Sequence, residues 1–117
     1  MIETNVLKKV RDSLSGLRSL LKREFALEVK DVKVASDTGN ITVMGRLNGP
    51  LASALDGDVK IEMVATPKNG YVLFRSSMQI AVPGKKRPNG TGFTFDRPFG
   101  LDLRTDKWST YQERNAA

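Results

Sequence analysis

The sequence predicts an α+β protein in which an N-terminal amphipathic helix packs on an antiparallel sheet of four or five strands, with a flexible basic C-terminal loop and arm. Three patterns support this prediction. Apolar residues recur at helical spacing near the N-terminus, then at every second position as far as Val82, and a basic segment rich in glycine and proline follows. We expect one domain over residues 1–95 and an extended, partly disordered arm over residues 96–117.

Residues 5–24 predict one helix, which Thr4 or Asn5 can cap. Its apolar stripe consists of Leu7, Val10, Leu14, Leu17 and Leu21. The strict alternation of three- and four-residue steps leaves two uses open: packing on the chain's own sheet, or pairing of helices between subunits. Gly16 lies within this helix and indicates a close approach or a slight bend there.

Two hairpins follow the helix. Alternating apolar residues predict strands at residues 27–36 and 41–47, with a bulge near Asp31. A second hairpin pairs residues 58–66 with residues 71–82. Each hairpin is joined by a short turn that contains glycine and asparagine.

The residue types that are missing limit the chemistry of this chain. It has no cysteine and no histidine, so disulfides, thiolate metal sites and the commonest general base are absent. Asp56 and Asp58 form a compact carboxylate pair, but further metal ligands are lacking. We therefore expect a protein that is not an enzyme and that has no cofactor and no metal site.

Length and hydropathy favour a cytoplasmic protein without a membrane partner. The chain of 117 residues has room for one ordinary domain. No apolar run reaches the roughly 18 residues that a membrane span needs, and charged residues from Lys8 to Asp12 interrupt any signal-peptide core.

The positive charge is concentrated toward the two ends of the sequence. Lys and Arg number 19 and Asp and Glu 13, which gives a net charge of +6. Residues 31–83 hold five basic and five acidic residues, whereas residues 1–30 and 84–117 each carry an excess of +3. Such a basic chain favours a polyanionic partner.

The strongest single signal is the basic triplet Lys85, Lys86 and Arg87 within residues 83–92, where glycines and prolines predict a loop. Three consecutive cations repel one another and serve no packing purpose, so we expect them to contact phosphates. Phe93 and Phe95 follow on a short predicted fifth strand, where they either stack on bases or fill the core.

The predicted arm combines cations with two more aromatic residues. Its candidate binding residues are Arg97, Arg104, Lys107, Trp108 and Tyr111. The two rings stack on bases, fill the core, dock on a protein partner or anchor the arm against another subunit. Four further cations lie on predicted strands and would form a basic floor if they shared one face: Lys33, Arg46, Lys60 and Arg75.

These patterns predict a non-catalytic, largely sequence-independent single-stranded DNA-binding protein that supports transcription or replication by holding opened strands. RNA remains an alternative ligand, because the contact that discriminates the 2′-OH leaves no compositional trace. A polymerase or another nucleic-acid enzyme is a further expected partner, and the chain is expected to form a homo-oligomer, either a dimer or a tetramer. The alternatives are a protein–protein adaptor of a nucleic-acid enzyme and a structural assembly protein.

Overall fold

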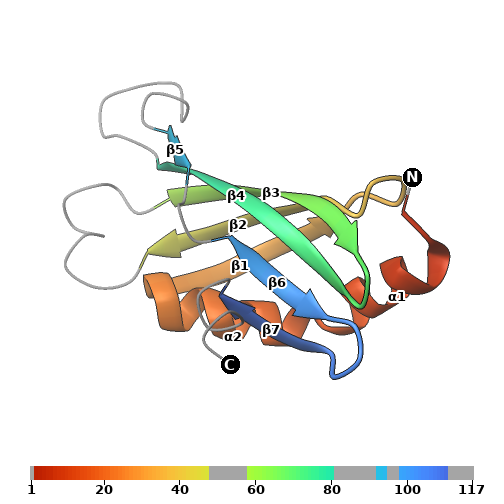
Figure 1. Ribbon diagram of the computed structural model, residues 1–117. Helices are drawn as coiled ribbons and strands as arrows, with labels where there is room; N and C mark the ends of the chain where they lie inside the picture. Colours follow the sequence, from red (N-terminus) through yellow and green to blue (C-terminus); the bar gives the residue numbers. More distant parts are fainter. Residues whose placement is uncertain (1, 48–57, 81–91, 95–97, 111–117) are drawn as a thin grey trace.

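The computed structural model describes residues 2–47, 58–80, 92–94 and 98–110, which form two helices followed by one antiparallel sheet (Figure 1). The elements are α1 Thr4–Asp12, α2 Leu14–Phe25, β1 Leu27–Val34, β2 Ile41–Leu47, β3 Asp58–Lys68, β4 Tyr71–Ile80, β5 Gly92–Thr94, β6 Phe99–Asp102 and β7 Lys107–Thr110. The predicted α+β class is confirmed, although the expected single helix is two helices and the sheet has seven strands, not four or five.

The break between the helices lies at Ser13, three residues before Gly16. Ser13 has φ −107° and ψ 11°, and its N–H donates to the Val10 carbonyl at 3.2 Å, one residue short of helical spacing. Gly16 provides the close approach that the sequence indicates, since a Cβ there would lie 3.1 Å from Cδ1 of Trp108. The bend is therefore set at Ser13, and Gly16 makes room for a ring.

Neighbouring strands in the sheet follow the order β1-β2-β3-β4-β6-β7. β6 pairs with the first half of β4, and β5 pairs with its second half. Both predicted hairpins are confirmed, with Val32 opposite Val43 in the first and Ile61 opposite Met78 in the second. The register of β1 shifts between Val29 and Asp31, which confirms the predicted bulge.

The part of the predicted arm that the structure describes belongs to the sheet. β6 pairs with the first half of β4, and β7 pairs with β6. Phe99 and Leu101 are fully buried, and the Phe99 ring meets the Phe25 ring edge-on at 6.1 Å. The prediction of an extended arm is therefore wrong for residues 98–110, because these residues form two short strands whose apolar side chains complete the core. Residues 111–117 lie outside the described residues.

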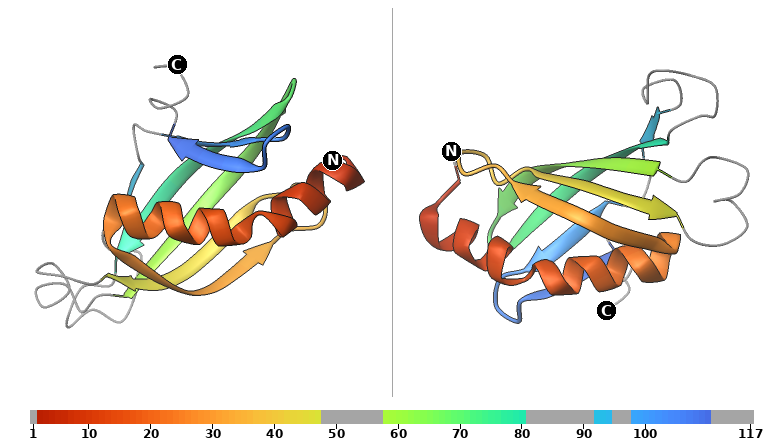
Figure 2. Two further views of the ribbon diagram at one scale, coloured as in Figure 1. Left: turned by 90° about the horizontal axis from the view of Figure 1, so that it is seen from below. Right: turned by 180° about the vertical axis from the view of Figure 1, so that it is seen from behind.

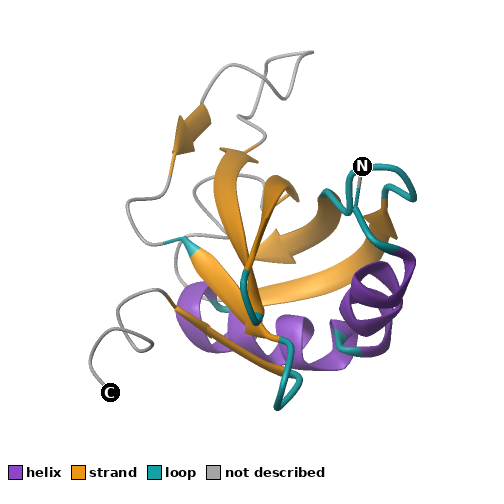
Figure 3. Ribbon diagram, turned by 45° about the vertical axis from the view of Figure 1, so that its right-hand side comes forward, coloured by secondary structure: helices purple, strands orange, loops and turns teal. Residues whose placement is uncertain are grey.

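The sheet curls around α2, and both of its edge strands, β1 and β7, contact that helix (Figures 2 and 3). The helical apolar stripe supplies the filling: Val10, Leu17 and Leu21 are fully buried, Leu7 is buried and Leu14 packs against the same core. The first of the two predicted uses, packing on the chain's own sheet, is confirmed. These side chains are consequently not available as a seam between subunits.

The part of the chain that the structure describes contains no helix long and apolar enough to cross a membrane.

Close backbone contact between β1 and β2 depends on Gly45, which lies opposite Val29 beside the bulge. A Cβ at this position would lie 2.5 Å from the Glu28 carbonyl oxygen and 3.1 Å from Leu27 Cδ1. Backbone cannot retreat as a flexible side chain can, so only glycine fits here.

Gly45→Ala is expected to lower the free energy of unfolding by about 2–3 kcal/mol through overpacking. Gly100→Ala is the matched control within a strand, since its Cβ would meet the Val72 carbonyl oxygen at an ordinary 3.9 Å. Urea unfolding followed by circular dichroism compares the two variants. Equal stability of both variants would contradict the close approach at Gly45.

Candidate nucleic-acid interface

One face of the sheet is packed on the helices, and no described element covers the other, which we call the outer face (Figures 1 and 2). Burial alternates accordingly along the strands. In β2, Ile41 and Val43 are buried toward the helices, whereas Met44 and Arg46 are exposed. The antiparallel register then assigns the outward residues of the other strands to the same side.

The four strand cations that the sequence could not assign to a face all lie on the outer face. Arg46 alternates with buried neighbours on β2, and Lys60 lies opposite the exposed Met44. Lys33 lies opposite Thr42, and Arg75 lies opposite the exposed Val64. The predicted basic floor is therefore possible in its geometry, since one uncovered surface carries all four cations.

Carboxylates offset two of these cations. Glu28 and Asp58 lie on either side of Arg46 in the register, and Lys60 Nζ forms an ion pair with Glu62 Oε1 at 3.1 Å. Lys33 and Arg75 have an uncharged residue opposite instead. Asp31, opposite the exposed Met44, lies two residues before Lys33 on the same face. Arg75 is therefore the one of the four whose neighbours opposite and two positions away on its strand are all uncharged. A phosphate contact at Arg75 costs less, because no existing ion pair has to be broken.

Apolar surface adjoins Arg75. Val64 opposite it is 51% exposed and adds apolar surface beside the cation. Leu73 and Tyr71 continue the outward positions of β4 and are half-buried. This part of the outer face combines a cation with flat apolar surface, the two features that an unpaired base and its phosphate require.

The basic triplet Lys85, Lys86 and Arg87 lies outside the described residues, but both ends of its segment are fixed by the sheet. The segment leaves β4 after Ile80 and returns at Gly92, which pairs with Gln79. Gln79 in turn lies opposite Lys60. The described residues that flank the segment, Gln79 and Gly92, thus lie at the Lys60 end of the sheet.

Arg104 and Lys107 lie at the opposite end of β4, on the β6–β7 hairpin, with Asp102 opposite both Tyr71 and Lys107. Arg104 Nε lies 3.6 Å from Asp102 Oδ1. The backbone N–H of Arg104 donates to the same oxygen at 2.9 Å, and these interactions hold the pKa of the Asp102 carboxyl below its usual value. Since β4 spans roughly 30 Å, these predicted binding residues lie far from Gln79, where Gly92 pairs at the other end of the strand.

Trp108 faces the helices and not the outer face. Its ring centroid lies 5.0 Å from that of the buried Phe74, and its Nε1 donates to the Ser13 carbonyl at 2.8 Å. The half-buried indole therefore ties β7 to the break between α1 and α2. Of the roles left open for this ring, the structure shows packing within the chain.

The other predicted aromatic and basic residues are placed only in part. The register puts Phe93 of β5 opposite Met78, which is buried on the helix side of the sheet. Phe95, Arg97 and Tyr111 lie outside the described residues.

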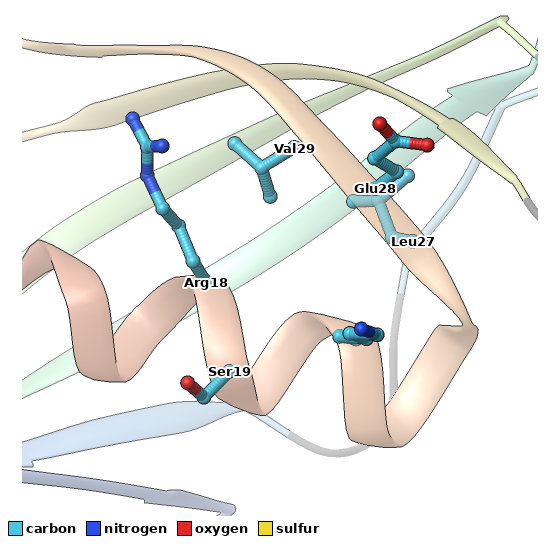
Figure 4. Close-up of a pocket in the computed structure, with 6 residues that line it drawn as sticks. Arg18, Ser19, Leu27, Glu28 and Val29 are labelled. Atoms are coloured by element: carbon cyan, nitrogen blue, oxygen red, sulfur yellow. The ribbon is translucent and has the colours of Figure 1, made fainter.

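A groove between α2 and the β1 edge is a feature that sequence reasoning missed. It has a volume of about 360 Å³ and is lined by Arg18, Ser19, Lys22, Leu27, Glu28 and Val29. Figure 4 shows Arg18 extending from α2 toward β1 beside Val29. The four-residue spacing of Arg18 and Lys22, which places two cations on one flank of a helix, was the available signal.

Within the described residues, no three His, Cys, Asp or Glu side chains are grouped as metal ligands would be. Comparison with known proteins found no matching family, no matching curated protein and no matching solved structure.

Trp108→Phe is expected to lower the free energy of unfolding by about 0.5–1.5 kcal/mol, because the Ser13 carbonyl loses its indole donor and keeps the backbone N–H of Gly16 at 3.1 Å. Ser13→Ala is the control: it keeps that carbonyl, and the Ser13 side chain makes no capping bond, so its effect is smaller. Thermal unfolding of both variants measures the difference. A Trp108→Phe protein as stable as wild type would contradict a stabilising hydrogen bond between Trp108 and Ser13.

Proposed function

We propose that this protein is a non-catalytic, largely sequence-independent single-stranded DNA-binding protein of the cytoplasm that holds opened strands during transcription or replication. The observation that supports the proposal best is the shared face of Lys33, Arg46, Lys60 and Arg75, which no described element covers. RNA is the alternative ligand for the same surface, since phosphates and base faces are common to both.

The form of this surface favours a single strand over a duplex. Reading a duplex requires a helix or a two-stranded ribbon that enters the major groove, and the outer face is instead a broad, curled sheet (Figure 3). A single strand is flexible enough to follow such a surface. Its phosphates would meet Arg75 and Lys33, and its bases would lie on Val64, Leu73 and Tyr71.

The basic triplet extends this interface in the proposal. Residues 81–91 contain Lys85, Lys86 and Arg87 and no acidic residue. Gly92, which follows this segment, pairs with Gln79 beyond Arg75 on β4, and in the proposal the triplet contacts a strand that continues past Gln79. Lys107 would extend the same path at the other end of β4.

A role as an adaptor of a polymerase or another nucleic-acid enzyme is the second candidate. Met44 and Val64 are 44% and 51% exposed on the outer face, and exposed large apolar side chains suit a protein interface. The same two residues could join copies of the chain into the dimer or tetramer that we propose, since the leucine stripe is already buried.

Fluorescence anisotropy of a labelled single-stranded DNA across a salt series tests the proposal. We expect salt-sensitive binding that is stronger to the single strand than to a duplex. Arg75→Gln removes one phosphate contact and should weaken binding about 3- to 10-fold and reduce the salt slope by about 0.7. Lys85/Lys86/Arg87→Ala should reduce the slope by about 2.

Arg23→Gln is the matched control, because Arg23 is an exposed arginine on α2, which covers the other face of the sheet, and it pairs with Glu24. Its salt slope should equal that of the wild type. Equally weak binding of single strand, duplex and RNA would reject the proposal and favour the adaptor.

A further inference from the structure

The helices carry a second row of cations that the proposed interface does not include. Within α1, Lys8 and Arg11 are three residues apart, and within α2, Arg18 and Lys22 are four residues apart. Residues at these spacings share one flank of a helix. All four side chains are exposed, and we call this set the basic flank.

The two flanks of the helices point to different edges of the sheet. Lys9 donates to the Leu103 carbonyl at 2.9 Å and Gly16 adjoins Trp108, so that flank faces the β6–β7 hairpin. Arg11 lies about 200° around α1 from Lys9. Arg18 and Lys22 line the groove against β1 (Figure 4), so the basic flank faces the β1 edge.

The β1 edge connects the basic flank to the outer face. β1 is the terminal strand of the sheet, and its exposed residues are Lys30 and Lys33 together with Glu28 and Asp31. A polyanion on the outer face would therefore meet cations at the edge and then on the helices beyond it. The groove between α2 and β1, with a volume of about 360 Å³, falls within the usual size of small-ligand sites.

Glu28 is the acidic residue that lines the groove, and the register places it opposite Arg46. Arg46, on the outer face, thus balances the negative charge of Glu28. Arg18 and Lys22 face the groove from the helix side, so the groove keeps an excess of positive charge. An anionic backbone fits this excess better than an acidic peptide would, because the charged β1 residues and the bulge discourage addition of a further strand.

We infer that the bound strand continues around the β1 edge and that its phosphates contact Arg18 and Lys22 in the groove, with Arg11 and Lys8 beyond. This inference rests on the proposed function and defines the path of the strand. A short oligonucleotide occupies the outer face alone, whereas a longer one also reaches the basic flank.

The test compares oligothymidines of about 8 and about 24 nucleotides, lengths on either side of a typical single-strand site. Arg18→Gln/Lys22→Gln should reduce the salt slope for the long oligonucleotide by about 1.4, or about 0.7 for each lost phosphate contact, and should leave the short one unchanged. Arg23→Gln, on the same helix but away from the groove, should change neither slope.

A label in the groove gives a second, direct readout. Because the chain has no cysteine, Ser19→Cys places one reactive thiol in the groove, and Thr105→Cys places one on the β6–β7 hairpin as control. Fluorescence of the Ser19→Cys conjugate should change with the long oligonucleotide and not with the short one.

The outcomes distinguish this inference from the proposed function. Binding of both lengths with no effect of Arg18→Gln/Lys22→Gln would overturn the path around β1 and leave the outer face as the interface. Equal effects on both lengths would also overturn it, because the basic flank would then belong to the primary site. Failure of the wild type to bind either length would reject the proposed function itself.

Discussion

The burial of α2 inside the curl of the sheet is the constraint on which the rest of the structure depends. A seven-stranded sheet with a strong twist leaves a concave face that must be filled. Leu17 and Leu21 fill it and are fully buried, and each such side chain contributes about 1.5–3 kcal/mol. Both edge strands rest on this helix, so the curl and the helix stabilise each other.

This arrangement also determines which surface is free. Because the helices occupy one face, every apolar strand residue that contributes to the core must point toward them. The alternate positions are left for polar residues, and the cations of four successive strands accumulate there. In the proposed function, the binding surface is thus a by-product of core packing: the alternation that buries Val43 also exposes Arg46.

Local periodicity made much of the fold predictable. The two hairpins, the bulge near Asp31 and the strand at Phe93 follow from residues that are neighbours in the sequence. The break at Ser13 was not predicted, and the Trp108 indole that donates to the Ser13 carbonyl lies 95 residues away in the sequence. The β6–β7 hairpin was also missed, because its short strands are recognisable only beside the first half of β4.

The candidate interface was also predictable only where it depends on residues that are neighbours in the sequence. Sequence alone identified Lys33, Arg46, Lys60 and Arg75 as cations on strands, but their common face required the register of three strand pairs. It grouped Arg104 and Lys107 with the basic triplet, whereas the β6–β7 hairpin lies at the Tyr71 end of β4 and Gly92, which follows the triplet's segment, pairs with Gln79 at the other end. Distance along a chain is a poor guide once strands return on themselves.

The balance of charge on the outer face bears on how such a surface would bind. Glu62 forms an ion pair with Lys60, and two carboxylates lie beside Arg46. Few cations of the outer face are therefore free of acidic neighbours. Each free cation displaces about one counterion from a single strand, which makes individual contacts weak and salt-sensitive. Affinity must then come from adding contacts, either along a longer path on one chain or across the copies of an oligomer, where effective concentration strengthens each further contact. A surface of this kind holds a strand without fixing its register, which is what sequence-independent binding requires.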